Sequence, residues 1–509
     1  MSKRNKPKSV KSYLRMIIRN ISTVSGTVHL TEKKGKQLVM WSFIMVINVC
    51  LTAAFILFVR LKYQDEQIVT EVNANCKVNQ VPFPCVSICN FNVVSDRESR
   101  NVRNLLKQHD IHEDEIVEFF KSLFLLRMLG GSNSNVPHFK NITDILRKHY
   151  YDMDTLMEEV HQKCEDLLLY CSFNRRRQNC EDVFNMIKTY QGHCCSFNYV
   201  GVDEENKQTM LTYDENNEYY EPGDDEAQMT KMIATSESGR ISGLYVLFNV
   251  EPDDYPSWDL GRFYGGRVLI NDPNDFPETT VLYEFFSSGD ALDLKVVPLV
   301  YQADANLQSV DSSVRNCWYP QEVSLEHTDR YSFETCNTEC KMQTYFLHCG
   351  CIPYKYPKVK GMRICDFSDL ECLHNVTVRV SNKDRACKPE CKVECNDKRY
   401  GITSSLSPFL ASDENELPPG TNLSQVSSLR VYYEKSSCNC YKMKFLIDFN
   451  FIIATFGGVF GLGFGGSILT IVEITILLIS TLYIVSSDLI TLYLIESKIS
   501  SKIKPYYMK

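Results

Sequence analysis

A glycine-rich segment within a long apolar run carries the residues best suited to chemistry. The run extends from Phe449 to about Ile495 and contains Gly465, Gly466 and Ser467, followed by Glu473. Glycine leaves backbone carbonyl oxygens uncovered by side chains, and a ring of such oxygens can coordinate a partly dehydrated cation. A carboxylate among apolar membrane residues is costly unless it faces water or a partner. The pattern predicts a cation pathway in which Glu473 contributes an acidic ring that concentrates cations.

The same small residues have a second interpretation. Glycine and serine in membrane helices often serve close helix packing, and packing is the better explanation for an isolated small-residue motif. We prefer conduction because the glycine segment, the carboxylate that follows it and the rest of the chain indicate the same kind of protein.

Two apolar runs predict two membrane crossings. The first, Leu38 to Val59, is uncharged over 22 residues, which at helical rise spans a hydrocarbon core of about 30 Å. It begins too late and is too long for a usual signal peptide. The second run is too long for one simple crossing, and its glycines predict a helix that tilts, breaks or extends beyond the lipid.

Lysine and arginine residues lie before the first run and after the second. Because cytosolic flanks are enriched in these residues, both termini are expected in the cytosol of a multi-pass plasma-membrane protein, with the basic tails touching anionic lipid. The predicted organisation is a cytosolic tail at 1–37, a transmembrane helix at 38–60, an extracellular domain at 61–445, a second transmembrane helix with the pore at 446–495 and a cytosolic tail at 496–509.

The middle region has the composition of an extracellular domain. Of the 21 cysteines, one (Cys50) lies in the first apolar run and the other twenty fall between Cys76 and Cys440. An even number suits a disulfide framework in an oxidising compartment. Acceptor triplets for N-glycosylation occur at Asn141, Asn375 and Asn422, which fits the same placement.

Hydrophobic periodicity in this region is mixed, which predicts an α+β domain. We expect helices at 114–129 and 152–170. We expect strands at 241–250, 266–270 and 430–433.

Motifs for catalysis are missing from the sequence. It contains no HExxH, Walker loop or GxSxG elbow, so we expect no enzyme, no catalytic residue and no cofactor. Close cysteine pairs such as Cys349 with Cys351 are more readily explained as disulfide partners than as zinc ligands. We expect no metal site and no nucleic-acid partner.

Phe83 to Asn90, after the first apolar run, reads FPCVSICN. This string is similar to the FPxVxICN signature of the degenerin, epithelial sodium channel and acid-sensing channel family, which the chain resembles over nearly its whole length. Gly266 to Pro273 resembles a strand of the family's palm region, with Asn271 where a histidine is usual. Cys336 to Pro353 is similar to the thumb pattern, and Cys395 to Tyr400 to the strand entry that follows. The resemblance implies a trimeric, amiloride-sensitive channel, homomeric or heteromeric, for which sodium is the permeant ion.

The resemblance also assigns residue roles. Gly461 to Thr470 looks like the family's selectivity motif, which implies that Gly465, Gly466 and Ser467 line the narrowest part of the pore. The family's cytosolic His-Gly appears here as Ser25-Gly26, so gating or inner-pore behaviour is expected to differ. The family's frequent aspartate after the pore glutamate is missing after Glu473, which puts divalent block and conductance in doubt.

By matched context, fourteen cysteines correspond to the family's seven disulfides, with Cys89 paired to Cys194 and Cys171 to Cys180. The full set is Cys89, Cys171, Cys180, Cys194, Cys317, Cys336, Cys340, Cys349, Cys351, Cys365, Cys372, Cys387, Cys391 and Cys395. Six others allow up to three further bridges whose pairing stays open, namely Cys76, Cys85, Cys164, Cys195, Cys438 and Cys440.

The opening signal is the least determined property. A short extracellular neuropeptide is the leading hypothesis, because residues 62–72 and 86–90 resemble the peptide-gated branch. Constitutive, proton-gated and mechanically gated channels are close rivals. The histidine pair of acid-sensing members is replaced by residues 63–67, although the acidic stretch 203–226 could still sense pH. An ATP-gated receptor lacks a Gly-x-Ser belt, and a non-conducting adhesion-type protein has no need of a glycine-broken helix.

Overall fold

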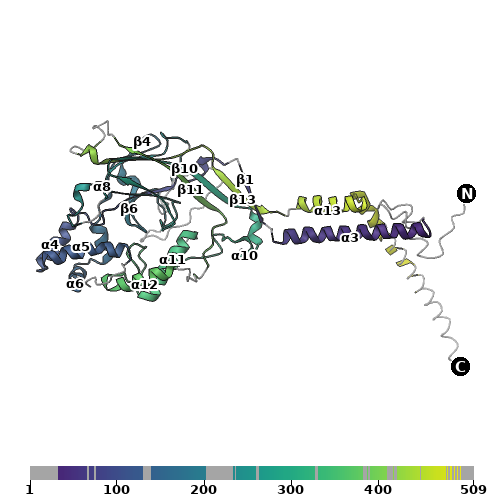
Figure 1. Ribbon diagram of the computed structural model, residues 1–509, viewed down its shortest axis with the longest axis horizontal. Helices are drawn as coiled ribbons and strands as arrows, with labels where there is room; N and C mark the ends of the chain where they lie inside the picture. Colours follow the sequence, from purple (N-terminus) through teal and green to yellow (C-terminus); the bar gives the residue numbers. More distant parts are fainter. Residues whose placement is uncertain are drawn as a thin grey trace, which may run out of the picture. The chain divides into compact units, whose positions relative to one another are not determined.

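A computed structural model describes most of the chain in two compact units. The described residues are 33–65, 68–73, 76–129, 139–201, 233–235, 237–258, 263–326, 331–381, 387, 390–409, 417, 421–446, 449–476 and single or paired positions between 478 and 493. One unit comprises 1–69 with 445–509, and the other comprises 70–444 (Figure 1). Ser25, Gly26 and the acidic stretch 203–226 lie outside the described residues.

The first unit contains the apolar helices. Helix α3 (Lys36–Asp65) includes a stretch, Lys36–Leu61, of mean hydropathy 2.5 whose side chains are mostly exposed. Helix α13 (Phe449–Phe464) is followed by a short helix, and the segments Asn450–Gly463 and Ile468–Ile476 meet at a bend of 76°. Among the described residues, α3 alone is long and apolar enough to span a membrane by itself, and the bent pair meets the same criterion only if its halves form one span.

The larger sheet of the second unit has eight strands in the order β1-β13-β10-β12-β7-β3-β4, with β11 also pairing to β10. Their bounds are β1 Ile68–Asn73, β3 Leu168–Phe173, β4 Arg176–Gln178, β7 Leu244–Asn249, β10 Asp290–Ala303, β11 Asp397–Pro408, β12 Val426–Tyr433 and β13 Asn439–Phe445. Strand β10 alternates buried residues such as Leu292, Leu294 and Val296 with more exposed ones, as expected when one face of a strand packs on a core.

The second sheet has the order β5-β6-β2-β8-β9, with bounds β2 Cys85–Asn90, β5 Phe184–Thr189, β6 Gly192–Phe197, β8 Gly265–Asn271 and β9 Leu282–Ser287. Two of the sequence motifs therefore become neighbouring antiparallel strands, since β2 pairs with β8. A Cβ atom at Gly266 would lie 2.1 Å from the carbonyl oxygen of Cys89, so this close approach requires glycine. The aromatic ring of Phe83 contacts Phe173 and Tyr433 within the main core.

Helices form two smaller cores beside the sheets. Helices α4 (Ser99–Gln108), α5 (Glu113–Arg127), α6 (Lys140–Lys148) and α7 (Met153–Glu159) share one core, while α11 (Phe333–Cys349) and α12 (Leu370–Ser381) share another. The remaining short elements are η1 Val78–Gln80, α8 Cys164–Leu167, α9 Cys180–Val183, η2 Pro252–Asp254, η3 Ala305–Ser309, α10 Ser312–Arg315, η4 Phe367–Asp369 and η6 Leu423–Gln425.

The prediction of an α+β domain in the middle of the chain is confirmed, but one of the two predicted helices is wrong. The helix predicted at 114–129 is α5, and strands occupy the three predicted strand regions as β7, β8 and β12. The helix predicted at 152–170 instead ends at Glu159, and strand β3 begins at Leu168. Pairing of β3 with β7 outweighs the helical periodicity there, because tertiary contacts override local propensity.

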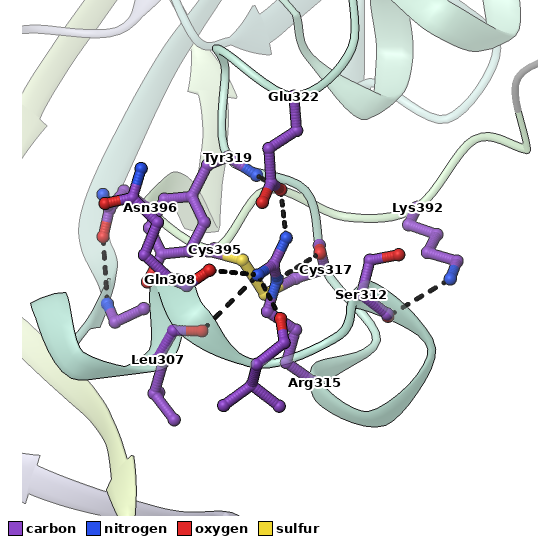
Figure 2. Close-up of a disulfide and its surroundings, with 12 residues drawn as sticks. Leu307, Gln308, Ser312, Arg315, Cys317, Tyr319, Glu322, Lys392, Cys395 and Asn396 are labelled. Carbon is purple, nitrogen blue, oxygen red and sulfur yellow. Dashed lines mark hydrogen bonds and ion pairs between the residues drawn. A yellow bond between two sulfur atoms is a disulfide. The ribbon is translucent and has the colours of Figure 1, made fainter.

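A buried arginine fixes the connection that follows β10 (Figure 2). The guanidinium of Arg315 donates hydrogen bonds to the carbonyl oxygens of Leu307, Gln308 and Val310 and to that of Cys317, and it pairs with the Glu322 carboxylate. Cys317 is joined to Cys395 beside it. One side chain thus satisfies several carbonyl groups that would otherwise lack partners in a compact turn.

We expect Arg315→Met to destabilise the protein by about 3 kcal/mol, because it leaves several carbonyl groups of the connection without a donor and removes the buried cation that pairs with Glu322. The matched control is Arg363→Met, which removes a half-exposed guanidinium paired with Asp369 and should cost no more than about 1 kcal/mol. Thermal unfolding of the full chain in detergent measures both variants. Equal midpoints for the two would contradict the role given to Arg315.

Candidate functional site

The glycine segment breaks the apolar helix at a defined point. Helix α13 ends at Phe464, and Gly465 adopts a left-handed backbone with φ of 62°. Its amide N–H donates to the carbonyl of Gly461 at 2.9 Å, and the amide of Gly466 donates to that of Phe460 at 3.2 Å. A side chain at position 465 would strain this conformation. The local sequence therefore explains why the chain bends here.

Ser467 starts the helix that follows the break. Its backbone N–H donates to the Thr470 hydroxyl at 3.1 Å, and the amide of Thr470 approaches the Ser467 hydroxyl at 3.4 Å. This reciprocal contact resembles a capping box, which satisfies amide groups at a helix start. Gly465 and Ser467 are exposed, and Glu473 lies half-buried in the helix after them. The structure thus brings Gly465, Gly466 and Ser467 together at the break.

A neighbouring glycine serves packing instead. A Cβ atom at Gly463 would lie 2.7 Å from Oγ1 of Thr52 in α3, and the Asn48 side-chain amide donates to the Gly463 carbonyl. The packing interpretation therefore holds for Gly463. Sequence reasoning missed Asn48 and Thr52, although two polar residues four positions apart in an apolar helix are a signal of helix–helix contact.

Large apolar side chains next to the helix break are exposed, because no other described part of the single chain packs on them. Leu462 is 93% exposed, Ile468 81% and Leu469 70%. Extended apolar surface of this kind is typical of contact with lipid or with further subunits.

Disulfides connect the elements of the second unit. The fourteen cysteines singled out in the sequence pair among themselves as Cys89–Cys194, Cys171–Cys180, Cys317–Cys395, Cys336–Cys391, Cys340–Cys387, Cys349–Cys372 and Cys351–Cys365. A further bridge joins Cys164 to Cys195, a pairing that sequence reasoning left open.

Three cysteines meet where β1 and β13 pair. Cys76 lies within bonding reach of both Cys438 and Cys440, with Cα–Cα distances of 5.1 and 5.9 Å. Both distances suit a disulfide, so Cys76 closes one bridge and leaves the other cysteine as a thiol. Cys85 is buried and forms no bridge, and burial raises the pKa of its thiol to about 12.

The three predicted glycosylation asparagines all lie on the surface. Asn141 is exposed in α6, Asn375 in α12, and Asn422 just before η6. The hydroxyl of Ser424 donates to the side-chain oxygen of Asn422 at 2.8 Å. An exposed acceptor triplet is what attachment of a bulky glycan requires.

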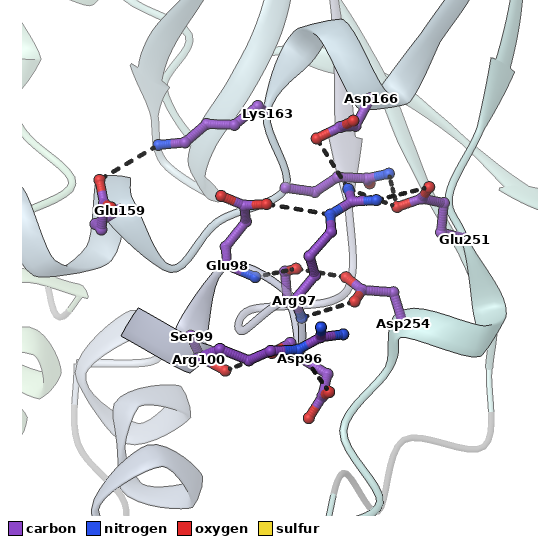
Figure 3. A network of polar contacts seen from close by, with 12 residues as sticks. Asp96, Arg97, Glu98, Ser99, Arg100, Glu159, Lys163, Asp166, Glu251 and Asp254 are labelled. Atoms are coloured by element: carbon purple, nitrogen blue, oxygen red, sulfur yellow. Dashed lines mark hydrogen bonds and ion pairs between the residues drawn. The ribbon is translucent and has the colours of Figure 1, made fainter. Parts of the chain in front are cut away.

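A network of acidic groups surrounds Arg97 (Figure 3). Its guanidinium lies 2.8 Å from Asp166, 3.0 Å from Glu251 and 3.2 Å from Glu98, while its backbone amide donates to Asp254. Burial raises the pKa of Asp166 and of Glu251, with Arg97 opposing the shift. These two carboxyl groups therefore take up protons at a higher pH than exposed ones do.

Burial shifts the pKa of two histidines downward, in contrast to the raised pKa values of Asp166 and Glu251. His161 and His193 lie with ring centroids 6.1 Å apart. Burial lowers the pKa of His161 to about 3 and holds the pKa of His193 well below its ordinary value. Both imidazoles are therefore neutral at physiological pH and do not change charge in that range.

We expect Gly463→Val to weaken the packing of α3 against α13 by about 1–2 kcal/mol, because the new side chain collides with Thr52. Surface delivery and thermal stability in detergent report the loss. Gly458→Val is the control, since a Cβ there meets no atom within 4 Å. Adding Thr52→Ala should restore part of the loss, and failure of this rescue would argue against the contact.

Comparison with known proteins identifies the family. The sequence model of the amiloride-sensitive sodium channel family matches residues 19–477. Pickpocket protein 28 of Drosophila melanogaster is 25% identical, over 89% of this chain and 76% of that protein. Sodium channel protein Nach of the same species is 22% identical, over 89% and 84% respectively. Epithelial sodium channel subunit beta of Homo sapiens is 22% identical, over 66% and 50%. The chain belongs to the amiloride-sensitive sodium channel family, whose members are plasma-membrane ion channels and not enzymes.

Proposed function

We propose that the chain is a pore-forming subunit of a trimeric, sodium-selective, amiloride-sensitive channel. The helix break at Gly465 carries the proposal, because it turns backbone carbonyl groups out of the regular helical hydrogen-bonding pattern at membrane depth. Such backbone is tolerated in a membrane only where protein or a water-filled pathway surrounds it. The family membership supports sodium as the permeant ion.

The proposed topology has two crossings with both termini in the cytosol. The apolar surface of α3 supports the first crossing, and the bent pair of helices supports a second, broken one. Basic residues before α3 and after position 495 favour a cytosolic location for both ends. Residues 61–445 then form the extracellular domain, and disulfides throughout this region suit that compartment.

The proposed pore uses one glycine segment from each of three subunits. Three copies of Gly465, Gly466 and Ser467 would present a ring of backbone oxygens that replaces part of the hydration shell of the ion. Glu473, in the next helix, adds an acidic ring that raises the local cation concentration. The exposed Leu462 and Ile468 side chains would contact lipid or neighbouring subunits. Family relatives described as channel subunits support assembly with like chains, either as a homotrimer or as a heterotrimer.

The opening signal that we favour is a short extracellular neuropeptide, on the resemblance of residues 62–72 to the peptide-gated branch. Constitutive opening, protons and mechanical force are rivals to be tested in the same recordings. A non-conducting adhesion role is the alternative from another class, and absence of current under all four conditions and with related subunits would favour it.

We expect thiol modification at position 467 to alter a sodium current. Cells expressing Ser467→Cys are recorded before and after a methanethiosulfonate reagent, with amiloride and with sodium replaced by a large cation. The native Cys50 thiol is exposed, so the background carries Cys50→Ser. Leu462→Cys, at an exposed position outside the break, is the matched control. Equal modification effects at 462 and 467 would refute placement of Ser467 at the narrow part.

We expect Glu473→Gln to reduce single-channel conductance about two- to tenfold at low ionic strength, because an acidic ring concentrates cations. The reduction should shrink as salt screens the charge. Glu473→Asp keeps the charge and serves as the control. A conductance in Glu473→Gln that matches the parent at low salt would exclude the acidic ring.

A further inference from the structure

Two helices of the α4–α7 core end in the same way. Helix α4 ends at Gln108 and α6 at Lys148, with His109 and His149 as their C-cap residues, and the residues after the caps, Asp110 and Tyr150, adopt left-handed backbones with φ of 60° and 65°. The amide after each of them donates back to a leucine carbonyl of the last turn, from Ile111 to Leu106 and from Tyr151 to Leu146. This is the Schellman pattern.

The matched caps hold both histidines in place. Leu106 and Leu146 are fully buried in the shared core, and Ile111 and Tyr151 pack against it. A tyrosine with positive φ is strained, and such strain persists only where the surrounding structure determines the backbone. Two rigid helix ends therefore carry His109 and His149 toward each other.

The two imidazole rings meet at the surface. The Nε2 atoms of His109 and His149 are 3.1 Å apart, with ring centroids at 5.3 Å. Both residues are exposed. Zinc–imidazole bonds are about 2.0–2.1 Å, so two nitrogens on one tetrahedral ion lie about 3.3 Å apart. The observed separation needs little adjustment to let both nitrogens bind one cation.

The electrostatic environment favours a positive ion. Each histidine stands at the C-terminal end of a helix, where the last carbonyl groups carry partial negative charge. Two of the neighbouring positive side chains are paired with carboxylates, Lys107 with Glu113 at 2.5 Å and Arg147 with Asp366 at 2.7 Å. The C-terminal ends of both helices thus place partial negative charge beside the histidines that cap them.

We propose that His109 and His149 together bind a divalent first-row transition-metal cation of the zinc or nickel type, with water completing its coordination. Imidazole nitrogen suits these ions and not the oxygen-seeking calcium or magnesium ions. The bound cation joins the ends of α4 and α6, which are 40 positions apart in the sequence, and stiffens this helical layer. The site is independent of the pore segment and of the proposed conduction.

The test uses full-length protein purified in detergent and stripped of metal with EDTA, then titrated with zinc chloride or nickel chloride alone. Equilibrium dialysis counts the bound ions, and thermal unfolding follows stabilisation. We expect one zinc ion fewer per chain in His109→Ala and in His149→Ala than in the parent. Zinc should raise the thermal midpoint of the parent by roughly 2–4 °C, through preferential binding to the folded state.

Matched controls separate this pair from other histidines. His112→Ala removes an exposed histidine close in sequence, and His348→Ala removes one on α11; both should retain the zinc ion and the thermal shift. Equal zinc binding by all four variants would overturn the proposal, as would no zinc binding by the parent. An equal thermal shift with calcium chloride would also overturn it, because the site would then use oxygen ligands.

Discussion

Backbone pairing along strand β10 is the interaction on which the rest of the second unit depends. This strand pairs antiparallel with β11 over positions 290–301, and parallel with β12 over 291–296 and with β13 over 299–303. Its buried face supplies Leu292, Leu294 and Val296 to the main core. Strand β13 also precedes α13 in the chain.

Covalent bridges and buried polar groups stabilise what the sheets do not reach. The helices beside the sheets form separate cores with fewer buried side chains than the main one. Disulfides such as Cys336–Cys391 and Cys340–Cys387 join α11 to the segment that precedes β11. Such links reduce the conformational freedom of the unfolded chain, which favours the folded state. Arg315 stabilises the connection after β10 without a covalent bond, because its guanidinium donates hydrogen bonds to the carbonyl groups there.

In the apolar unit, the glycines of segment 463–466 have two roles, helix packing and helix interruption. Gly463 allows α3 and α13 to approach, because a side chain there would collide with Thr52. Gly465 permits the left-handed residue that ends α13, and Ser467 caps the helix that follows. Packing and conduction were competing explanations of the whole motif. The geometry assigns packing to Gly463, while Gly465 to Ser467 form the break on which the proposed pore rests.

The sequence alone was sufficient to predict the features that depend on residues close together in the chain. Apolar length predicts α3, glycine and serine at adjacent positions predict a helix interruption, and motif spacing identifies the family and the set of fourteen cysteines. Contacts between distant residues required the tertiary structure. Local periodicity could not show that β3 replaces a helix, because the distant partner strand β7 decides it, with Leu168 paired to Phe248 and Phe173 to Leu244. Nor could it show that Cys76 meets two cysteines or that His109 meets His149, because side-chain proximity across the fold is set by packing rather than by sequence spacing.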